Sequence, residues 1–426
     1  MTAALLITGV LVCLALRVPV AVALMVPSLI AIAADPDASV AVAVQQLTSG
    51  VNSSPLLAVP LFIMAGYAAS ISGIAERLVS FAQDLLAPVR GGLGYVTIGT
   101  GLVFSWMSGS ATADAAGMGS VLSSPLQRRE YDSGFAAGLI GASASIGAVM
   151  PPSIAAIVYA VTAGVSIGAL FVAGVVPALL IVIALVVSVF LWARRHQPPR
   201  SSLPPGRQLV QKGLTVLPVL GAPVIVLGGI LGGIFTPTEA AAIAVAYILL
   251  LGFCYRELSL RSVQVLLTRS ASTAAQVMFI VAGASLFGWI LTVEQIPAAL
   301  AEGIAGLTDS PLVFLLLVNL VLLVIGMFLE ATAALLIMVP VLLPTAVELG
   351  VDPLHLGAVM VLNLTIGLLT PPVGMILYVL ASVTKAPIAT VTRGSARFLI
   401  PLCAVLLVLT FVPAIALTLP NLLGFG

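Results

Sequence analysis

Apolar runs follow one another along almost the whole chain and are separated by short polar segments. A membrane-spanning helix needs about 20 predominantly apolar residues. The runs near this length predict spanning segments at about 1–16, 18–34, 57–85, 133–161, 164–192, 214–233, 238–254, 274–292, 355–383 and 398–418. The stretches 35–52 and 255–272 are expected to be helices that lie along the two membrane faces. Thr236-Pro237-Thr238-Glu239 has a helix-capping pattern and predicts a helix start at Pro237.

Double prolines interrupt two of the spanning segments, 133–161 and 355–383. The first break reads Ser145-Ile146-Gly147-Ala148-Val149-Met150-Pro151-Pro152, and the second reads Thr365-Ile366-Gly367-Leu368-Leu369-Thr370-Pro371-Pro372. Proline lacks a backbone donor and clashes with the preceding turn, so a helix cannot continue through such a pair. In lipid, the freed carbonyls are tolerated only where they line a cavity or bind an ion. The two breaks therefore indicate a transport site.

The two breaks belong to a longer internal repeat. Phe62-Ile63-Met64-Ala65-Gly66 recurs as Phe279-Ile280-Val281-Ala282-Gly283, and the offset between matching positions stays between 217 and 220 residues. A constant register over this length indicates a duplication. The predicted repeats are 1–192 and 213–426, joined by a linker at 193–212 whose arginines place it in the cytoplasm. Tracing the segments outward from this linker gives the two repeats opposite orientations, as an inverted repeat requires.

Two further apolar segments, 92–125 and 311–344, are too short to be two spanning helices each. They are predicted to be re-entrant helical hairpins, one entering from each side of the membrane. The fold class is therefore an all-α polytopic membrane protein built from an inverted repeat with two hairpins and two broken helices.

Composition agrees with this fold class. Of the 426 residues, 61% are hydrophobic and 7% are charged, against roughly 25% charged residues in a soluble domain. The net charge of +1 gives no reason to expect nucleic-acid binding. An intramembrane enzyme is also disfavoured, because Lys212 and Lys385 lie at predicted membrane ends and no histidine lies at mid-depth. Arg269 is expected at the cytoplasmic face, so no lone arginine at mid-membrane depth marks an anion site.

The predicted hairpin tips carry polar residues at mid-bilayer depth, which is costly unless something polar uses them. The first tip contains Ser105, Ser108, Ser110, Thr112 and Asp114, and the second contains Gly326, Glu330 and Thr332. Hydroxyls and free carbonyls are oxygen ligands suited to an alkali cation, and half-helix N-termini suit a substrate carboxylate. Close packing of small residues is the alternative interpretation. Asp114 and Glu330 have two open interpretations: coupling of ion to substrate, or hydrogen bonding within the hairpin.

Several of these segments together resemble the large membrane subunit of tripartite ATP-independent periplasmic (TRAP) transporters, over essentially the whole chain. They are Ser108-Gly109-Ser110-Ala111-Thr112-Ala113-Asp114-Ala115, the first break through Ser153, Leu170-Phe171-Val172-Ala173-Gly174 with Pro177, Phe235-Thr236-Pro237-Thr238-Glu239-Ala240, and Ile366-Gly367 to Gly374. The resemblance implies sodium-coupled secondary active uptake of an organic acid across the bacterial inner membrane by an elevator mechanism. It also implies two partners, a periplasmic substrate-binding protein and a separate small four-helix membrane subunit.

The resemblance further implies which residues bind ions and substrate. One sodium site is expected at Ser105, Ser108, Ser110, Ser145, Gly147 and Met150. The other is expected at Gly326, Thr332, Thr365, Gly367 and Thr370. Substrate contacts are expected from Ser110, Thr112, Pro152, Ser153 and Pro372. A stand-alone sodium/dicarboxylate symporter of the same superfamily is the alternative function, and protons are the alternative coupling ion.

Overall fold

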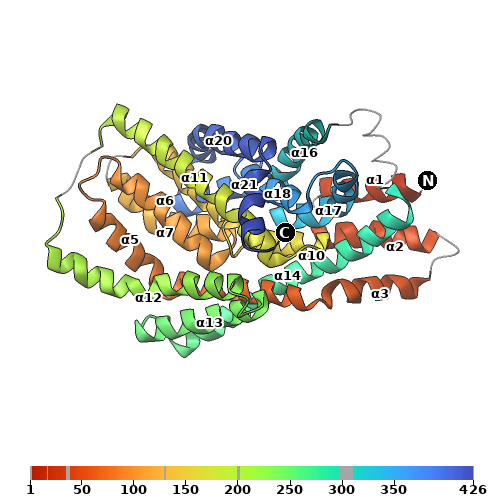
Figure 1. Ribbon diagram of the computed structural model, residues 1–426, viewed down its shortest axis with the longest axis horizontal. Helices are drawn as coiled ribbons and strands as arrows, with labels where there is room; N and C mark the ends of the chain where they lie inside the picture. Colours follow the sequence, from red (N-terminus) through yellow and green to blue (C-terminus); the bar gives the residue numbers. More distant parts are fainter. Residues whose placement is uncertain are drawn as a thin grey trace.

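The computed structural model describes residues 2–16, 18–34, 39–128, 131–198, 202–296 and 310–425, and these residues form helices and no strand (Figure 1). The helices of the first part of the chain are α1 (Thr2–Ala15), α2 (Val20–Ala34), α3 (Val40–Val51), the short 3₁₀ helix η1 (Ser54–Leu57), α4 (Ala58–Ile71), α5 (Ile74–Leu85), α6 (Gly92–Ser108), α7 (Ala111–Arg128), α8 (Ser133–Ala144), α9 (Ile146–Val149), α10 (Ile154–Ala163) and α11 (Ile167–His196). Those of the second part are α12 (Gly206–Leu231), α13 (Pro237–Cys254), α14 (Leu260–Val293), α16 (Pro311–Gly326), α17 (Ala331–Glu348), α18 (Pro353–Gly367), α19 (Met375–Thr384), α20 (Ile388–Phe411) and α21 (Ala414–Leu422). The predicted all-α fold class is confirmed.

Eight helical segments of the described residues are long and apolar enough to cross a membrane, fewer than the ten that the sequence pattern predicts. They are Ser54–Ile71, Ser133–Ala163, Ile167–His196, Gly206–Leu231, Pro237–Cys254, Leu260–Val293, Ala331–Glu348 and Ile388–Phe411. The second broken segment does not reach this length because it is divided into helices of 15 and 10 residues.

Several predicted helix boundaries differ from those of the structure. The expected helix at 57–85 is divided at Gly73, whose φ of 67° lies in the left-handed region that favours glycine. The stretches 255–272 and 274–292 are not separate elements, since α14 runs through both without interruption. The last expected helix, 398–418, ends at Phe411, and a shorter helix resumes after Pro413. Helix also extends into both ends of the expected linker 193–212, because α11 ends at His196 and α12 begins at Gly206.

Two helix pairs occupy the ranges expected for hairpins. The first pair, α6 and α7, is joined by Gly109 and Ser110, and the second, α16 and α17, is joined by residues 327–330. The two double prolines lie in the non-helical connections from α9 to α10 and from α18 to α19, and both Pro-Pro bonds are cis. Each proline pair therefore ends a helix, as expected from its chemistry.

The hairpins and broken helices pack on one another in a crossed arrangement. Hairpin helix α7 contacts α19 from the second broken segment, and hairpin helix α17 contacts α10 from the first. The crossing of α8 and α20 is especially close, because a Cβ on Gly394 would lie 1.8 Å from the Gly134 carbonyl oxygen. Small residues allow such close approach between helices in membranes.

A second group of helices lies beside this unit, and we call this group, α1–α5 with α12–α14, the framework. α14 contacts α2, α3 and α4, and α13 contacts α4 and α12. Two salt bridges tie α5 to the second half of the chain: Arg77 to Glu257 at 3.1 Å and Lys212 to Asp84 at 2.5 Å. The framework therefore combines helices from both halves of the chain.

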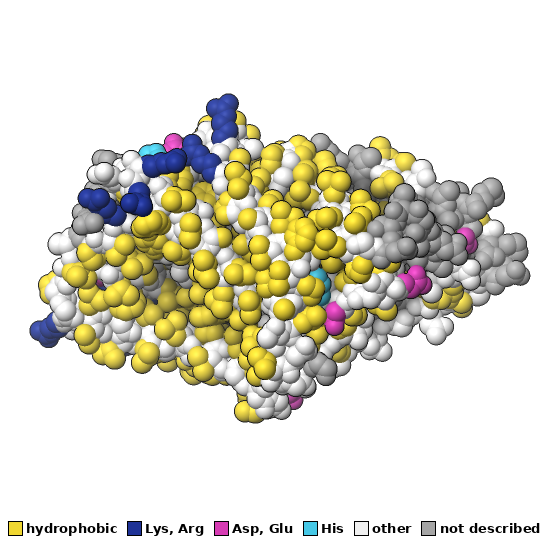
Figure 2. Space-filling model, turned by 45° about the horizontal axis from the view of Figure 1, so that its top comes forward, with side chains coloured by type: hydrophobic (Ala, Val, Ile, Leu, Met, Phe, Trp, Pro, Cys, Tyr) yellow, Lys and Arg dark blue, Asp and Glu magenta, His cyan; other side chains and the backbone are white. Residues whose placement is uncertain are grey.

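The surface agrees with a membrane protein. Figure 2 shows hydrophobic side chains over most of the visible face, with lysine and arginine gathered at its left end. The C-terminal end of α11 and the start of α12 lie at this same end in Figure 1. Large side chains such as Leu250 and Leu320 are more than half exposed, which is expected where lipid is the solvent.

Candidate functional site

The tip of the first hairpin docks onto the first helix break. Gly109 has a φ of 62°, which turns the chain sharply between α6 and α7. A Cβ at Gly109 would lie 2.6 Å from the Pro152 carbonyl oxygen, so only glycine allows this approach. The Ile154 amide donates a hydrogen bond to the Gly109 carbonyl at 3.2 Å. The double proline therefore leaves a backbone donor that the hairpin tip uses.

The second hairpin tip docks onto the second break in the same way. The Gly374 amide donates to the Met327 carbonyl at 2.9 Å, again from the second residue after the proline pair. Gly326 and Gly367 pack directly on each other, because a Cβ on Gly367 would lie 2.6 Å from the Gly326 carbonyl carbon. The structure thus brings the expected residues Gly326 and Gly367 together.

Hydroxyl groups near both breaks have their proton already engaged. Ser105 donates to Leu102 O at 2.5 Å and Ser145 donates to Ala142 O at 2.6 Å. Thr365 donates to Val361 O at 2.6 Å and Thr370 donates to Ile366 O at 2.7 Å. A hydroxyl with its single proton used has only oxygen lone pairs left to offer. These four side chains are therefore set up to accept a donor or to bind a cation.

Asp114 lies where the first hairpin meets the first break. The Ser108 hydroxyl donates to its Oδ1 atom. The other carboxylate oxygen, Oδ2, is buried and has no hydrogen-bond partner among the described residues. A Cβ on Gly147 would lie 1.9 Å from Oδ2 and 3.6 Å from the Ser105 Cα, so these residues are neighbours. A buried carboxylate oxygen without a partner is costly, and a bound cation beside it would remove that cost.

Glu330 has a different, local role. Its side chain caps α17 by accepting from the Thr332 amide at 2.9 Å and the Ala333 amide at 3.3 Å, and it also accepts from the Thr332 hydroxyl. An acidic side chain at a helix N-terminus is a stabilising arrangement. Glu330 and Thr332 thus form one hydrogen-bonded unit at the second tip.

Both tips face one cavity of about 770 Å³. The first tip contributes Ser108, Ser110, Thr112 and Asp114, and the second contributes Glu330, Ala331, Thr332 and Ala333. The Ser110 and Thr112 hydroxyls lie 3.1 Å apart on this wall. On the framework side, Gly66 of α4 packs against the tip, since its Cβ would lie 2.8 Å from the Ser108 Cα.

The other expected substrate contacts, Pro152, Ser153 and Pro372, are not among the residues that line this cavity. Pro152 is buried beneath Gly109, and Pro372 is exposed. The Ser153 hydroxyl caps α10 by accepting from the Ala156 amide at 3.1 Å, and it donates to Ala148 O. Met150, expected in the first sodium site, is buried and its amide donates to Ile146 O at 2.8 Å.

The sequence prediction missed the framework wall of the cavity. Arg269, Thr273 and Gln276 of α14 line it together with Tyr67 of α4. The sequence pattern predicts Arg269 at the cytoplasmic face and does not predict that it lines this cavity. Its expected place on a separate surface helix is wrong, because α14 continues past it. The spacing of Arg269, Thr273 and Gln276 could have indicated this wall from the sequence, because positions i, i+4 and i+7 share one helix face.

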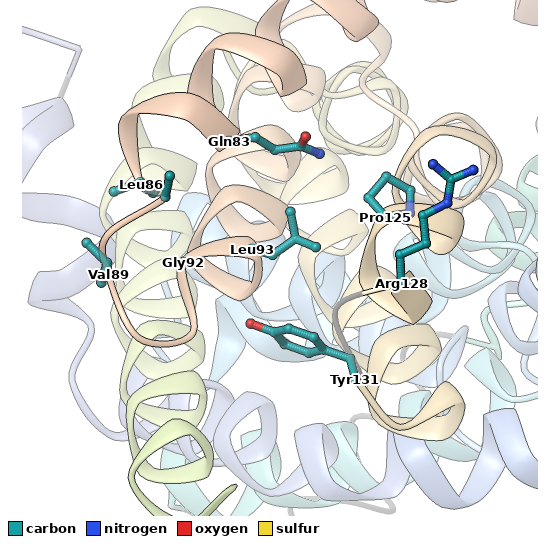
Figure 3. A pocket seen from close by; sticks show the side chains of 9 residues that line it. Gln83, Leu86, Val89, Gly92, Leu93, Pro125, Arg128 and Tyr131 are labelled. Atoms are coloured by element: carbon teal, nitrogen blue, oxygen red, sulfur yellow. The ribbon is translucent and has the colours of Figure 1, made fainter. Parts of the chain in front are cut away.

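A smaller pocket of about 240 Å³ lies at the ends of α6 and α7 remote from the tip. Figure 3 shows the Gln83 side chain above Leu93, the Arg128 side chain to their right and Tyr131 below. Tyr131 also accepts from the Gly94 amide at 3.3 Å and stacks on Trp192 with ring centroids 4.6 Å apart. This pocket lies at the base of the first hairpin and is separate from the cavity at the tips.

Hairpins and broken helices that meet around one cavity, among long apolar helices, form the site of a multi-pass membrane transporter. The family model described as tripartite ATP-independent periplasmic transporter, DctM component, matches residues 7–415. The chain belongs to this family, as the large permease subunit of a TRAP transporter. It is a multi-pass integral protein of the bacterial inner membrane and a transporter subunit, not an enzyme.

Named relatives agree over most of the chain. The sialic acid TRAP transporter large permease protein SiaM of Vibrio cholerae is 44% identical over 390 residues, covering 90% of each chain. The C4-dicarboxylate TRAP transporter large permease protein DctM of Pseudomonas aeruginosa is 40% identical over 372 residues, covering 87% of each. The crystal structure of the YdaH transporter of Alcanivorax borkumensis has a similar fold, with a TM-score of 0.62 at 17% identity, covering 89% of this chain and 90% of that one.

Proposed function

We propose that this subunit imports an organic acid together with sodium ions, using the two hairpin tips and two helix breaks as its binding region. The observation that carries the proposal is the matched docking of each tip on a break, around one shared cavity. Both relatives named above are large permeases for carboxylic acids, sialic acid and C4-dicarboxylates. That likeness and the hydroxyl groups that line the cavity support the import of an organic acid by this chain.

The first sodium ion would be held by Ser105, Ser145 and the backbone near Gly147. Three features support this assignment: the engaged hydroxyl protons, the burial of both serines, and the free Oδ2 atom of Asp114 beside Gly147. Ser108 would act through Asp114, to which it donates, while Ser110 and Thr112 face the cavity and the substrate. Of the two open interpretations of Asp114, this geometry favours coupling.

The second sodium ion would be held by Thr365, Thr370 and backbone oxygens near Gly326 and Gly367. Thr365 is buried, and its proton is engaged with its own helix. Thr332 is committed to Glu330, so we assign this pair to holding the second tip rather than to ion binding. Glu330 is accordingly a structural residue in this proposal.

The transport step would be an elevator movement, in which the hairpins and broken helices shift as a unit past the framework. Sodium binding at the tips would favour the form of the site that accepts substrate, since a ligand stabilises the state that it binds better. Two partners are part of the proposal: a periplasmic binding protein that delivers the substrate, and a small four-helix membrane subunit beside the framework.

Reconstituted uptake tests the proposal. The chain and its small membrane partner are placed in liposomes, and uptake of radiolabelled sialic acid and succinate is measured under an inward sodium gradient, with and without the loaded binding protein. We expect uptake only when sodium and the binding protein are both present. Uptake by this chain without a binding protein would instead establish the stand-alone symporter. Uptake driven by a pH gradient without sodium would overturn the sodium assignment.

A further inference from the structure

A polar stripe on α14 forms the framework wall of the cavity, opposite the hairpin tips. Arg269, Thr273 and Gln276 are spaced by four and three residues, so they share one face of the helix. All three line the cavity, and the Thr273 hydroxyl lies 3.2 Å from the Tyr67 hydroxyl, which lines it too. This stripe has no part in the tip-and-break geometry described above.

The Arg269 side chain is exposed in the cavity and has no ion-pair partner among the described residues. Arg77 and Lys212 differ in this respect, because Arg77 is paired with Glu257 and Lys212 with Asp84. A guanidinium has five donors in a rigid planar fork, a geometry that matches the two oxygens of a carboxylate. An unpaired arginine facing a cavity is therefore suited to bind an anionic ligand group.

Three acidic residues also line the cavity, and two of them accept hydrogen bonds from their own hairpin. Asp114 accepts from Ser108, and Glu330 caps α17. Glu76 lies in the first turn of α5, where the helix dipole stabilises a carboxylate. Arg269 is the one basic side chain among the residues that line this cavity. An anion that enters is attracted to this position and repelled by the others.

We propose that Arg269 is the fixed anion-binding residue of this transporter, holding the carboxylate of the organic acid against the framework while the hydroxyls of the first tip receive the rest of the molecule. Thr273 and Gln276 supply neutral hydrogen-bonding groups along the same wall. The inference rests on the proposed import of an organic acid.

A labelling experiment tests the position and charge of Arg269 without requiring transport. Cys13, Cys254 and Cys403 are replaced by alanine, and Gln276→Cys is labelled with an anionic and with a cationic methanethiosulfonate reagent of similar size. Gln276 is about 10 Å along the helix from Arg269. A unit charge at that distance raises the labelling rate of the anionic reagent about two-fold, and lowers that of the cationic reagent about two-fold, even in water. Arg269→Gln should therefore lower the ratio of the anionic to the cationic labelling rate about four-fold or more.

Arg261→Gln is the matched control, because it removes the same charge from the same helix about 22 Å from Gln276, beyond the screening length. It should leave the ratio unchanged. An unchanged ratio in Arg269→Gln would overturn the proposal. That result is expected if Arg269 instead holds a lipid phosphate at the membrane face.

Uptake in the reconstituted system supplies the second readout. At saturating loaded binding protein, Arg269→Gln should lower the sodium-driven rate about tenfold or more, corresponding to the loss of one charge-assisted pair. Arg269→Lys should retain more activity, and Arg261→Gln should match the parent. Parent-like uptake by Arg269→Gln would overturn the proposal. A parent protein that imports no organic acid would contradict the proposed function itself, and the labelling ratio would still report whether Arg269 sets the charge of the cavity.

Discussion

At the scale of single residues, the site is defined by where protons and lone pairs are already committed. Ser105, Ser145, Thr365 and Thr370 each donate to a carbonyl three or four residues earlier in the chain, which leaves only oxygen lone pairs. Asp114 contributes the buried carboxylate oxygen without a partner among the described residues. These details separate groups that can bind a cation from groups, such as Ser153, that complete a helix cap.

Gly147→Ala should strongly lower sodium-driven uptake. The added methyl would lie 1.9 Å from the Asp114 Oδ2 atom, so the carboxylate must move away from the first break. We expect a fall in uptake of about tenfold or more, because a shifted ligand group loses an interaction of about 1.4 kcal/mol or more. Gly99→Ala is the control, since nothing lies within 4 Å of its Cβ. Equal uptake in the two variants would show that the contact between Gly147 and Asp114 has no role in coupling.

Asp114→Asn tests the charge at the same position while keeping its shape. The amide can still accept from Ser108, but it brings no negative charge to the cation. The sodium concentration for half-maximal uptake should rise about tenfold, since hydrogen bonds and contacts to charged groups contribute about 1.5–3 kcal/mol. Ser120→Ala, on the same helix and also lining the cavity, is the control. An unchanged sodium dependence in Asp114→Asn would favour the purely structural interpretation.

Residue chemistry was predictable wherever it depends on local sequence. The Thr236–Glu239 capping box is present as expected, because a capping box involves only neighbouring residues. The free Oδ2 atom of Asp114 was not predictable, because its surroundings come from α6, α7 and α9 together. The position of Arg269 in the cavity depends in the same way on how α14 packs against the hairpins.

At the scale of helices, glycine and proline determine where elements break and how closely they cross. The double prolines located both breaks in the sequence, since proline acts on the chain next to it. Gly73 was not recognised as a break, because an isolated glycine within an apolar run is compatible with either a continuous or a divided helix. The continuity of α14 was missed for the opposite reason: a polar stretch with Arg261 and Arg269 resembles a membrane boundary.

Gly394→Ala should destabilise the folded protein through the crossing of α8 and α20. Its Cβ would lie 1.8 Å from the Gly134 carbonyl oxygen, so the helices must separate along their contact. Overpacking of this kind costs about 1–3 kcal/mol. Thermal unfolding of the purified protein should show a lower midpoint than in the parent. Gly228→Ala, where nothing lies within 4 Å, should not lower it; an equal shift in both variants would mean that the crossing is not the cause.

At the scale of the whole molecule, the proposed mechanism treats the hairpins and broken helices as one moving body and the framework as another. The crossed contacts of α7 with α19 and of α17 with α10 tie both hairpins to both breaks. α14 of the framework contacts α17 of the second hairpin, across the boundary that the proposal places between the moving body and the framework. The sequence repeat predicts two related halves, but it gives no information on which helices from each half share a body, because that depends on packing between the halves.

The most direct test of the account is a disulfide placed across that boundary in a cysteine-free background. A Cβ on Gly288 of α14 would lie 3.6 Å from the Pro340 Cβ of α17, within the range of about 3.5–4.5 Å for a disulfide. Oxidation of the Gly288→Cys, Pro340→Cys pair should stop sodium-driven uptake, and reduction should restore it.

A pair inside the proposed moving body is the control. A Cβ on Gly119 of α7 would likewise lie 3.6 Å from the Val383 Cβ of α19. Oxidation of Gly119→Cys with Val383→Cys should leave uptake unchanged, because both helices move together. Full uptake by the oxidised Gly288–Pro340 pair, with the disulfide verified by mass spectrometry, would contradict movement of the hairpins past the framework.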